Sequence, residues 1–389
     1  MKNLIHSLFT IFLLVTFASC ETDVQPGKVE RVTREIVDKF APDKRVAIFE
    51  LVSEKQADGN LVLKGETNLP EAHDLLIDTL TSLNIEVVDS VRILPDEALG
   101  GKHWGLVTLS VIPMRGNPAY SAEMVSQTIL GTPVKLLDKR GGWYRIQTPD
   151  LYIGWVSGSG LVPMTADQIA DWKRANRYVF AAINGWVLAE PSSAAETVSD
   201  LVLGSLFEVN KTVNGYLQVQ FPDKRGGYVK ASECLPLKEW ESIQPEAGAV
   251  IATARKLLGS PYLWGGTSTK GVDCSGFVKT AYLSQGVMLA RDASQQAQFG
   301  EALDITDFQF EPGDLLFFGR SKDHITHVGL YIGDGHFIHS SGRVKINSFN
   351  PDDENYDPRR KVELVAARRV LNSLNNGQII PIKEHSWYN

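Results

Sequence analysis

Three residues in the second half of the chain have side chains suited to nucleophilic catalysis: one cysteine and two histidines. Cys274 lies in the stretch GVDCSGFVKTAY, where an apolar, helix-like pattern begins directly after it. A helix N-terminus offers free amide N–H groups and the positive end of the helix dipole, which favour a thiolate. We therefore expect a lowered pKa for the Cys274 thiol, within the range of about 3.5–7.5 that such settings produce.

A thiol nucleophile needs a base, and two downstream histidines are placed to supply one. The segment HVGLYIGDGHFIHSS alternates like two strands joined by the tight turn GDG. His327 precedes this turn and His339 follows it, so the two side chains can face each other on paired strands. One imidazole would then accept the thiol proton while the other orients it.

The motifs around these residues resemble those of the NlpC/p60 family of cysteine peptidases. PYLWGG, GVDCSGFV, RDASQQ, EPGDLLFF and HVGLYIGDGHFIHSSG follow one another within residues 246–371. The resemblance implies a papain-like α+β core, with helices packed on an antiparallel sheet. It implies Cys274 as nucleophile, His327 as general base and acid, and His339 as orienting residue. It also matches Tyr262 to a tyrosine that helps bind the oxyanion, although the residues alone are equally compatible with a packed aromatic side chain.

Two segments upstream of this domain align without gaps at an offset of 73 residues. The triplet GWV at Gly154, for example, corresponds to GYV at Gly227. Each segment has short alternating runs separated by glycine turns, which is typical of a small antiparallel barrel. The doubled pattern resembles the bacterial SH3 domain, here at residues 104–165 and 175–241, and residues 166–178 read as a helical connector between the two.

The layout of two SH3 units before the catalytic domain resembles the γ-D-glutamyl-L-diamino acid endopeptidases, or dipeptidyl-peptidase VI group. This resemblance implies cleavage of the murein peptide L-Ala-γ-D-Glu-diamino acid after D-Glu. It also implies that the first SH3 unit walls the active site and that an acidic cluster holds the free amine of L-Ala. Glu123 could instead be an exposed strand charge, and Ala293 stands where relatives often carry serine. The positions that match substrate-binding residues are Glu123, Tyr152, Asp273, Ser275 and Asp292.

The first twenty residues have the features of a targeting segment. Lys2 precedes the apolar run from Leu8 to Ala18, which is too short to span a bilayer. The run ends in FASC, which resembles the lipobox of bacterial lipoproteins and implies lipidation of Cys20. The other interpretation is an ordinary secretory signal that contains a cysteine. We expect an exported protein, anchored by lipid to the bacterial cell envelope on the periplasmic side or at the cell surface.

The remaining segments show no chemistry. Residues 28–100 predict a small α+β unit of unknown role, and residues 372–389 a C-terminal tail. Within the unit, paired strands are expected around the turn ADGN, and one helix is expected to present a single apolar face. That face is predicted to consist of Leu75, Leu76, Leu80 and Leu83.

Cysteine content and charge limit the other possibilities. With Cys20 lipidated, only Cys234 and Cys274 remain, and an exported chain could pair them. Cys234 corresponds to Leu161 in the repeat, so we interpret it as a small buried hydrophobic residue instead. The net charge of −7 shows no basic bias and argues against general nucleic-acid binding. We expect a monomer.

Two other functions remain open at this point. One is a broader peptidoglycan hydrolase that acts on the intact sacculus, and the other is a wall-binding lipoprotein whose catalytic domain is silent. A zinc site built from one cysteine and two histidines is a further possibility. Because the peptidase motifs explain the same three residues better, we expect neither a metal nor a cofactor.

Overall fold

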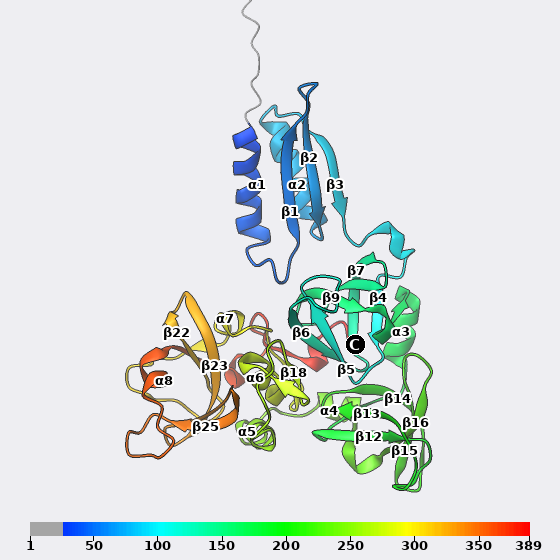
Figure 1. Ribbon diagram of the computed structural model, residues 1–389, viewed down its shortest axis with the longest axis vertical. Coiled ribbons are helices and arrows are strands. Elements are labelled where there is room, and N and C mark those ends of the chain that lie inside the picture. The colour runs from blue at the N-terminus through cyan, green and yellow to red at the C-terminus, as the bar shows by residue number, and fades with distance from the viewer. Residues whose placement is uncertain (1–25) are drawn as a thin grey trace, which may run out of the picture.

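The computed structural model describes residues 26–389, which form four units along the chain (Figure 1). They are the N-terminal unit (26–99), the first β-unit (104–164), the second β-unit (177–236) and the C-terminal unit (247–389). The predicted targeting segment and Cys20 lie outside the described residues. Within the described part of the chain, none of the helices combines the length and the apolar character needed to cross a membrane.

The N-terminal unit is a three-stranded sheet with two helices on one face (Figure 1). The expected hairpin around ADGN is present, and β3 then pairs parallel to β2. Helix α1 was not expected from the sequence. In α2 the predicted apolar face is partly wrong: Leu76 and Leu80 are buried, but Leu75 and Leu83 are 39% and 48% exposed. The elements are α1 (Pro26–Phe40), β1 (Phe49–Lys55), β2 (Leu61–Thr67), α2 (Pro70–Ser82) and β3 (Val88–Ile93).

The first β-unit is a seven-stranded antiparallel sheet in the order β10-β4-β7-β8-β9-β5-β6. Alternate residues of its short strands point inward and form a compact apolar core, as in a small barrel. Helix α3 (Ala166–Arg174) follows it as the expected connector. The strands are β4 (Trp104–Val107), β5 (Val111–Arg115), β6 (Met124–Ile129), β7 (Pro133–Arg140), β8 (Trp143–Gln147), β9 (Ile153–Ser157) and β10 (Leu161–Met164).

The second β-unit repeats this topology strand for strand, in the order β17-β11-β14-β15-β16-β12-β13. Cys234 opens β17 as Leu161 opens β10, and its side chain is buried in the core of the unit. Cys234 and Cys274 are both free thiols. The elements are β11 (Arg177–Phe180), β12 (Asn184–Leu188), β13 (Thr197–Val202), β14 (Leu206–Val213), β15 (Tyr216–Gln220), β16 (Gly226–Lys230), β17 (Cys234–Pro236) and α4 (Leu237–Glu241).

The C-terminal unit is built on a six-stranded antiparallel sheet in the order β21-β26-β22-β23-β24-β25. Alternate residues of β22 enter two different apolar clusters, so the sheet is covered on both faces. Its principal elements are α5 (Ala247–Lys256), α6 (Cys274–Leu283), α7 (Ala293–Gln296), α8 (Pro358–Glu363), β21 (Glu301–Ala302), β22 (Leu315–Ser321), β23 (His324–Gly333), β24 (His336–Ser341), β25 (Arg343–Ser348) and β26 (Leu364–Arg369). Two short strand pairs complete it: β18 (Thr267–Ser268) with β19 (Gly271–Val272), and β20 (Val287–Met288) with β27 (Ile380–Pro381).

Residues 372–389, expected as a tail, pack against the other units. The rings of Trp104 and Trp387 meet edge to face, and Tyr388 is buried. The imidazole of His385 contacts the carbonyl oxygen of Pro149 at 3.0 Å. This segment therefore ties the C-terminal unit to the first β-unit.

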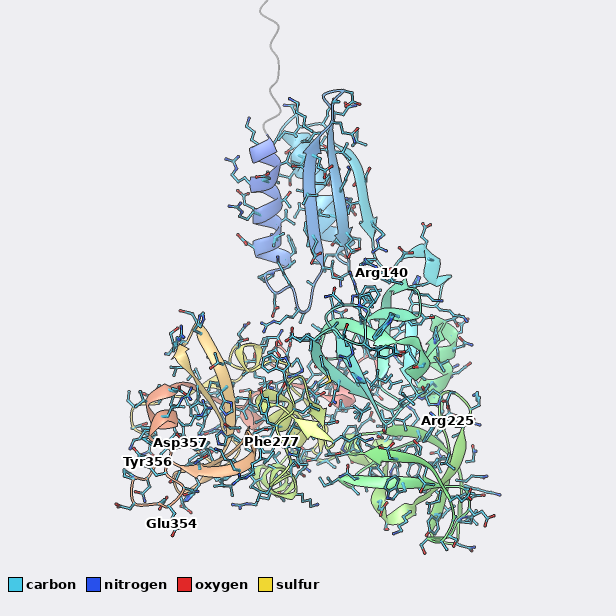
Figure 2. The ribbon with its side chains drawn as sticks, viewed as in Figure 1. Arg140, Arg225, Phe277, Glu354, Tyr356 and Asp357 are labelled. Carbon is cyan, nitrogen blue, oxygen red and sulfur yellow. The ribbon has the colours of Figure 1, made fainter. Side chains whose placement is uncertain are left out.

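Arginines join the units at two further places, both labelled in Figure 2. Arg140 belongs to an ion-pair cluster with Asp138 and Glu66 that links the first β-unit to the N-terminal unit. Arg225 of the second β-unit donates to the carbonyl oxygen of Thr108 in the first at 2.6 Å. All four units are thus connected by polar contacts of specific residues.

Candidate active site

Cys274 is the first residue of α6, and the residue before it caps the helix. Oδ1 of Asp273 accepts a hydrogen bond from the backbone N–H of Gly276 at 2.7 Å, which is the pattern of an N-cap. A side chain at Gly276 is excluded, because a Cβ atom there would lie 1.9 Å from the carbonyl oxygen of Gly266. The loop that precedes the helix therefore packs directly against it and fixes the position of the cysteine.

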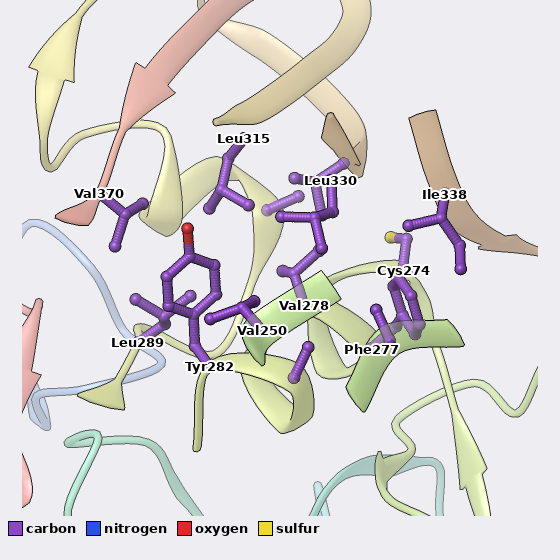
Figure 3. Close-up of a cluster of buried hydrophobic side chains, with 14 of the residues drawn as sticks. Val250, Cys274, Phe277, Val278, Tyr282, Leu289, Leu315, Leu330, Ile338 and Val370 are labelled. Atoms are coloured by element: carbon purple, nitrogen blue, oxygen red, sulfur yellow. The ribbon is translucent and has the colours of Figure 1, made fainter. Parts of the chain in front are cut away.

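The side chain of Cys274 lies among the apolar residues between α6 and the sheet and is 8% exposed (Figure 3). This burial raises the pKa of the thiol to about 11, and the neighbouring Asp273 carboxylate contributes to the rise. The backbone N–H groups of Val328 and Ser275 favour the thiolate without outweighing the burial. The prediction of a lowered pKa is therefore wrong, and the resting thiol is protonated at neutral pH.

The imidazoles of His327 and His339, from the neighbouring strands β23 and β24, contact each other. Nε2 of His327 lies 2.8 Å from Nδ1 of His339. The turn between the strands is Asp334-Gly335, and both residues have positive φ, as a two-residue hairpin loop requires. The sulfur of Cys274 lies against the backbone N–H of Val328, the residue after His327. Within the described residues, the sulfur makes no hydrogen bond with either imidazole; such contacts often tighten only when substrate binds.

Asn347 on β25 is hydrogen-bonded to His339, and this contact determines which nitrogen of each imidazole carries the proton. Its side-chain Nδ2 donates to the carbonyl oxygen of Asn355 at 2.8 Å, so its Oδ1 is left to accept from Nε2–H of His339 at 2.9 Å. Nδ1 of His339 is then an acceptor for Nε2–H of His327, and Nδ1 of His327 carries a free lone pair. Asn347 was not among the residues predicted from the sequence. Its position one strand beyond the histidine hairpin was the only signal.

Both imidazoles are held in the neutral form by their surroundings. Burial lowers the pKa of His339 to about 4, against the opposing effect of its bond to Asn347. Burial lowers the pKa of His327 well below its ordinary value, and the nearby Arg360 guanidinium adds to this. The chain Asn347–His339–His327 therefore presents a neutral base beside a neutral thiol.

A cavity of about 390 Å³ is lined by Cys274 together with residues of the first β-unit and the C-terminal unit. The predicted substrate-binding residues and the predicted oxyanion-binding tyrosine all line it, as does Arg45 from the N-terminal unit. Burial raises the pKa of Tyr262, so its phenol stays a neutral hydrogen-bond donor. The predicted residues on the lining are Glu123, Tyr152, Tyr262, Asp273, Ser275 and Asp292.

Asp273 forms an ion pair with a buried arginine that was not predicted from the sequence. Arg291, whose side chain is 1% exposed, donates to Asp273 from Nη2 at 2.6 Å and from Nη1 at 3.2 Å. It also donates to the hydroxyls of Ser275 and Ser126. With the N–H groups of Gly276 and Gly265 added, both carboxylate oxygens of Asp273 have several donors. Asp273 thus positions the start of α6 and has little capacity left for a ligand.

The other two predicted carboxylates differ in their partners. Oδ2 of Asp292 accepts from Tyr152 at 3.2 Å and from Arg45 at 2.8 Å. Glu123 accepts from the indole N–H of Trp264 at 2.8 Å. Glu123 has no cationic partner within residues 26–389, so it is the cavity's carboxylate with an uncompensated charge. Burial raises the pKa of Tyr152, and Asp292 adds to the rise, so this phenol remains protonated.

Comparison with known proteins identifies two parts of the chain. Residues 259–361 match the NlpC/P60 family, and residues 114–161 match the bacterial dipeptidyl-peptidase SH3 domain. The chain is 30% identical over 229 residues to the γ-D-glutamyl-L-lysine dipeptidyl-peptidase of Bacillus cereus, covering 56% of this chain and 67% of that protein. It is 30% identical over 279 residues to dipeptidyl-peptidase 6 of Lysinibacillus sphaericus, covering 68% of this chain and 98% of that protein. The chain belongs to the NlpC/P60 family.

Solved structures of NlpC/P60 proteins have the same fold. A family member from Bacillus cereus superposes with a TM-score of 0.59 at 24% identity, over 69% of this chain and 99% of that one. An NlpC/P60 endopeptidase from Photobacterium damselae superposes with a TM-score of 0.52 at 18% identity, over 68% and 70% of the two chains. These likenesses establish the NlpC/P60 fold with an SH3-like domain. Across residues 26–389, no group of three or more histidine, cysteine or acidic side chains is arranged to hold a metal ion.

Replacing Asn347 in this NlpC/P60 protein is expected to change the base without unfolding the domain. Asn347→Ala removes the acceptor that fixes the tautomer of His339, and kcat is expected to fall by about tenfold or more. Asn347→Asp supplies a negative acceptor, which stabilises the imidazolium form and raises the pKa of the histidine pair. The acid limb of the kcat/KM profile should therefore move to higher pH.

The measurement is a pH–rate profile of the two variants and of Asn350→Ala. Asn350 is an exposed asparagine three residues later, whose side chain bonds Asp353 rather than a histidine. An Asn347→Asp profile identical to that of the unaltered protein would show that Asn347 does not act on the base.

Proposed function

We propose that this protein is a cysteine endopeptidase that cleaves the γ-D-Glu–diamino acid bond of L-Ala-γ-D-Glu-diamino acid peptides, with a free N-terminal L-Ala, in murein peptide recycling. The main support for the proposal is the cavity lined by Cys274 on one side and by Glu123 and Tyr152 of the first β-unit on the other. Its volume of about 390 Å³ suits the short acyl portion of such a peptide rather than a polymer strand. The names of the two relatives support the same substrate class.

The proposed reaction begins with proton transfer from Cys274 to the free Nδ1 of His327. The sulfur then attacks the carbonyl carbon of the γ-D-glutamyl amide and forms a tetrahedral intermediate. Its oxyanion accepts a hydrogen bond from the Tyr262 phenol. His327 returns its proton to the amine of the diamino acid, which leaves, and a thioester remains. Water, deprotonated by His327, hydrolyses the thioester and regenerates the thiol.

His339 and Asn347 keep His327 in the tautomer that these reaction steps require, with its proton on Nε2 and a free lone pair on Nδ1. When His327 takes the thiol proton, it becomes an imidazolium that still donates from Nε2–H to His339. The neutral resting pair converts to an ion pair only during attack. Because the thiol is protonated at rest, His327 must remove its proton before each attack on the substrate. His327 is therefore needed for formation of the thioester as well as for its hydrolysis.

Among the cavity's carboxylates, Glu123 is the strongest candidate to bind the substrate ammonium. Asp273 is occupied by Arg291, and Asp292 is shared with Arg45. Ammonium groups taken out of water require such a partner. We assign Tyr152 and Asp292 to the same end of the peptide and Ser275 to the vicinity of the scissile bond, because Ser275 follows the nucleophile.

Blocking the substrate amine tests the proposal. Acetylation removes the positive charge and leaves Glu123 without its partner, so kcat/KM is expected to fall at least about tenfold, the effect of some 1.4 kcal/mol. Intact sacculus, in which L-Ala is amide-linked, should be nearly inert. Hydrolysis of free and N-acetylated peptides can be followed by mass spectrometry.

The matched pair of variants is Glu123→Gln and Glu196→Gln. Glu196 is the repeat counterpart of Glu123, at the same offset of 73, and it is exposed on the second β-unit away from the cavity. Only Glu123→Gln should lower the ratio of kcat/KM for the free peptide over the N-acetylated peptide. Equal kcat/KM on both peptides, or rapid release of peptides from sacculus, would favour the broader peptidoglycan hydrolase instead.

We further propose that the protein is exported and held to the cell envelope by lipid on Cys20. The motif FASC supports this proposal. A single acyl chain binds membranes only marginally, whereas two or more give stable anchoring. Full-length protein is expected to sediment with membranes, and Cys20→Ala should release it or prevent its processing. A processed Cys20→Ala protein that still partitions fully with membranes would exclude this residue as the anchor.

A further inference from the structure

The segment that links α1 to β1 in the N-terminal unit reaches the active-site cavity. The backbone carbonyl of Arg45 accepts a hydrogen bond from the N–H of Ile153 in β9 at 2.8 Å. The next carbonyl, that of Val46, accepts from Nε2 of Gln147 at 2.8 Å. The main chain at 45–46 is therefore attached to the first β-unit directly beside Tyr152, and the side chain of Arg45 lines the cavity.

The guanidinium of Arg45 is held in a fixed orientation. Its Nε and Nη2 donate to the two oxygens of Asp43, both at 2.8 Å, which is a bidentate pair. Asp43 is itself fixed by Nε2 of Gln295 at 2.7 Å. The remaining nitrogen, Nη1, points to the cavity wall and donates to Oδ2 of Asp292 at 2.8 Å and to the hydroxyl of Ser294 at 3.1 Å.

Asp292 is consequently shared between two arginines. Arg45 contacts its Oδ2, and Nη1 of Arg291 lies 3.7 Å from its Oδ1. An ammonium that approached Asp292 would meet a positive charge at hydrogen-bond distance from the same carboxylate. The attraction of Asp292 for a cationic ligand is therefore partly offset by guanidinium groups that Asp43 and Asp273 share, whereas Glu123 has no cationic partner within the described residues.

We infer that Arg45 is a specificity-determining residue through which the N-terminal unit limits the preference of the cavity for a free amino terminus. This inference rests on the proposed function. The guanidinium partly compensates Asp292 and leaves Glu123 as the main ammonium site. The cavity therefore discriminates against peptides with an acylated, uncharged amino end less strongly than it would if Asp292 were also uncompensated. The N-terminal unit is thereby part of the substrate site.

The test compares Arg45→Gln with the unaltered protein on L-Ala-γ-D-Glu-diamino acid and on its N-acetyl form. Removing the guanidinium frees Asp292, so the ratio of kcat/KM for the free peptide over the acetylated one should rise by about tenfold. Arg45→Lys keeps the charge and should stay close to the unaltered ratio. Lys44→Gln removes the same charge from the exposed neighbouring residue and should leave the ratio unchanged.

The alternatives give different results. If Arg45 binds an anionic group of the substrate, Arg45→Gln lowers kcat/KM equally on both peptides, and the inference is wrong. If Arg45 only docks the N-terminal unit, Arg45→Gln lowers the Tm and leaves the ratio unchanged, and the inference is again wrong. If the unaltered protein cleaves neither peptide, the proposed function itself fails, and this result is separate from any effect of Arg45.

Discussion

Replacing Cys274 by alanine is expected to abolish peptide hydrolysis, with kcat falling by a factor on the order of 10⁵ or more, as for loss of the nucleophile in other hydrolases. Without the sulfur no thioester can form. The variant keeps only the residues that bind the substrate and its oxyanion. Because burial raises the pKa of this thiol to about 11, its alkylation by iodoacetamide should be slow at neutral pH and accelerate as the pH rises. Cys274→Ala should remove this labelling altogether.

Cys234→Ser is the matched control, because both cysteines are free and 8% exposed. Cys234 lies in the apolar core of the second β-unit, where its sulfur contacts the carbonyl oxygen of Lys230 at 3.6 Å. A serine hydroxyl can make the same contact. Hydrolysis should therefore persist in Cys234→Ser, and mass spectrometry of labelled peptides should place the alkylation on Cys274. Full activity of Cys274→Ala would overturn the cysteine-peptidase mechanism.

The largest effect on stability is expected from Arg291→Met. Arg291 is almost fully buried, and its removal leaves the carboxylate of Asp273 in a buried site without a counter-charge. Breaking such a pair from one side typically costs about 3–5 kcal/mol. The free energy of unfolding should fall by that amount in urea denaturation. Activity should fall as well, because Asp273 caps the helix that carries Cys274.

Two variants separate this explanation from a general loss of packing. Arg174→Met removes an exposed arginine whose partner Asp171 is equally exposed, and such surface pairs contribute at most about 1 kcal/mol. The double variant Arg291→Met/Asp273→Asn removes the stranded charge and should recover part of the loss. If Arg291→Met were as mild as Arg174→Met, the buried ion pair would not support the site.

The part of the site that the sequence predicted depends on local structure. A helix starts at Cys274 because an apolar stripe follows a capping aspartate. His327 and His339 meet because a two-residue turn fixes the register of one hairpin. Both features are encoded within about fifteen residues, so motif spacing is sufficient to find them. The repeat at an offset of 73 residues likewise predicted two sheets, and these have the same strand order.

The parts that could not be predicted depend on contacts between distant segments. Arg45 meets Asp292 across 247 positions of sequence, and no local pattern indicates that contact. Asn347 joins the histidines only because β25 pairs with β24 in one particular register. The pKa of Cys274 is raised rather than lowered. The sequence pattern indicates the helix terminus, which favours the thiolate, but it does not show that β23 and β24 bury the sulfur.

The catalytic residues and the substrate-binding residue Glu123 differ in how strongly dissolved salt screens their charges. The thiol and both imidazoles are buried and uncharged at rest, so counter-ions have no access to the ion pair that forms during attack. Glu123 lines the cavity and is exposed to solvent, where mobile ions at physiological ionic strength screen charges over about 8 Å. Added salt should therefore raise KM for a peptide with a charged amino terminus and leave kcat nearly constant, so that ionic strength acts on binding of the substrate and not on its cleavage.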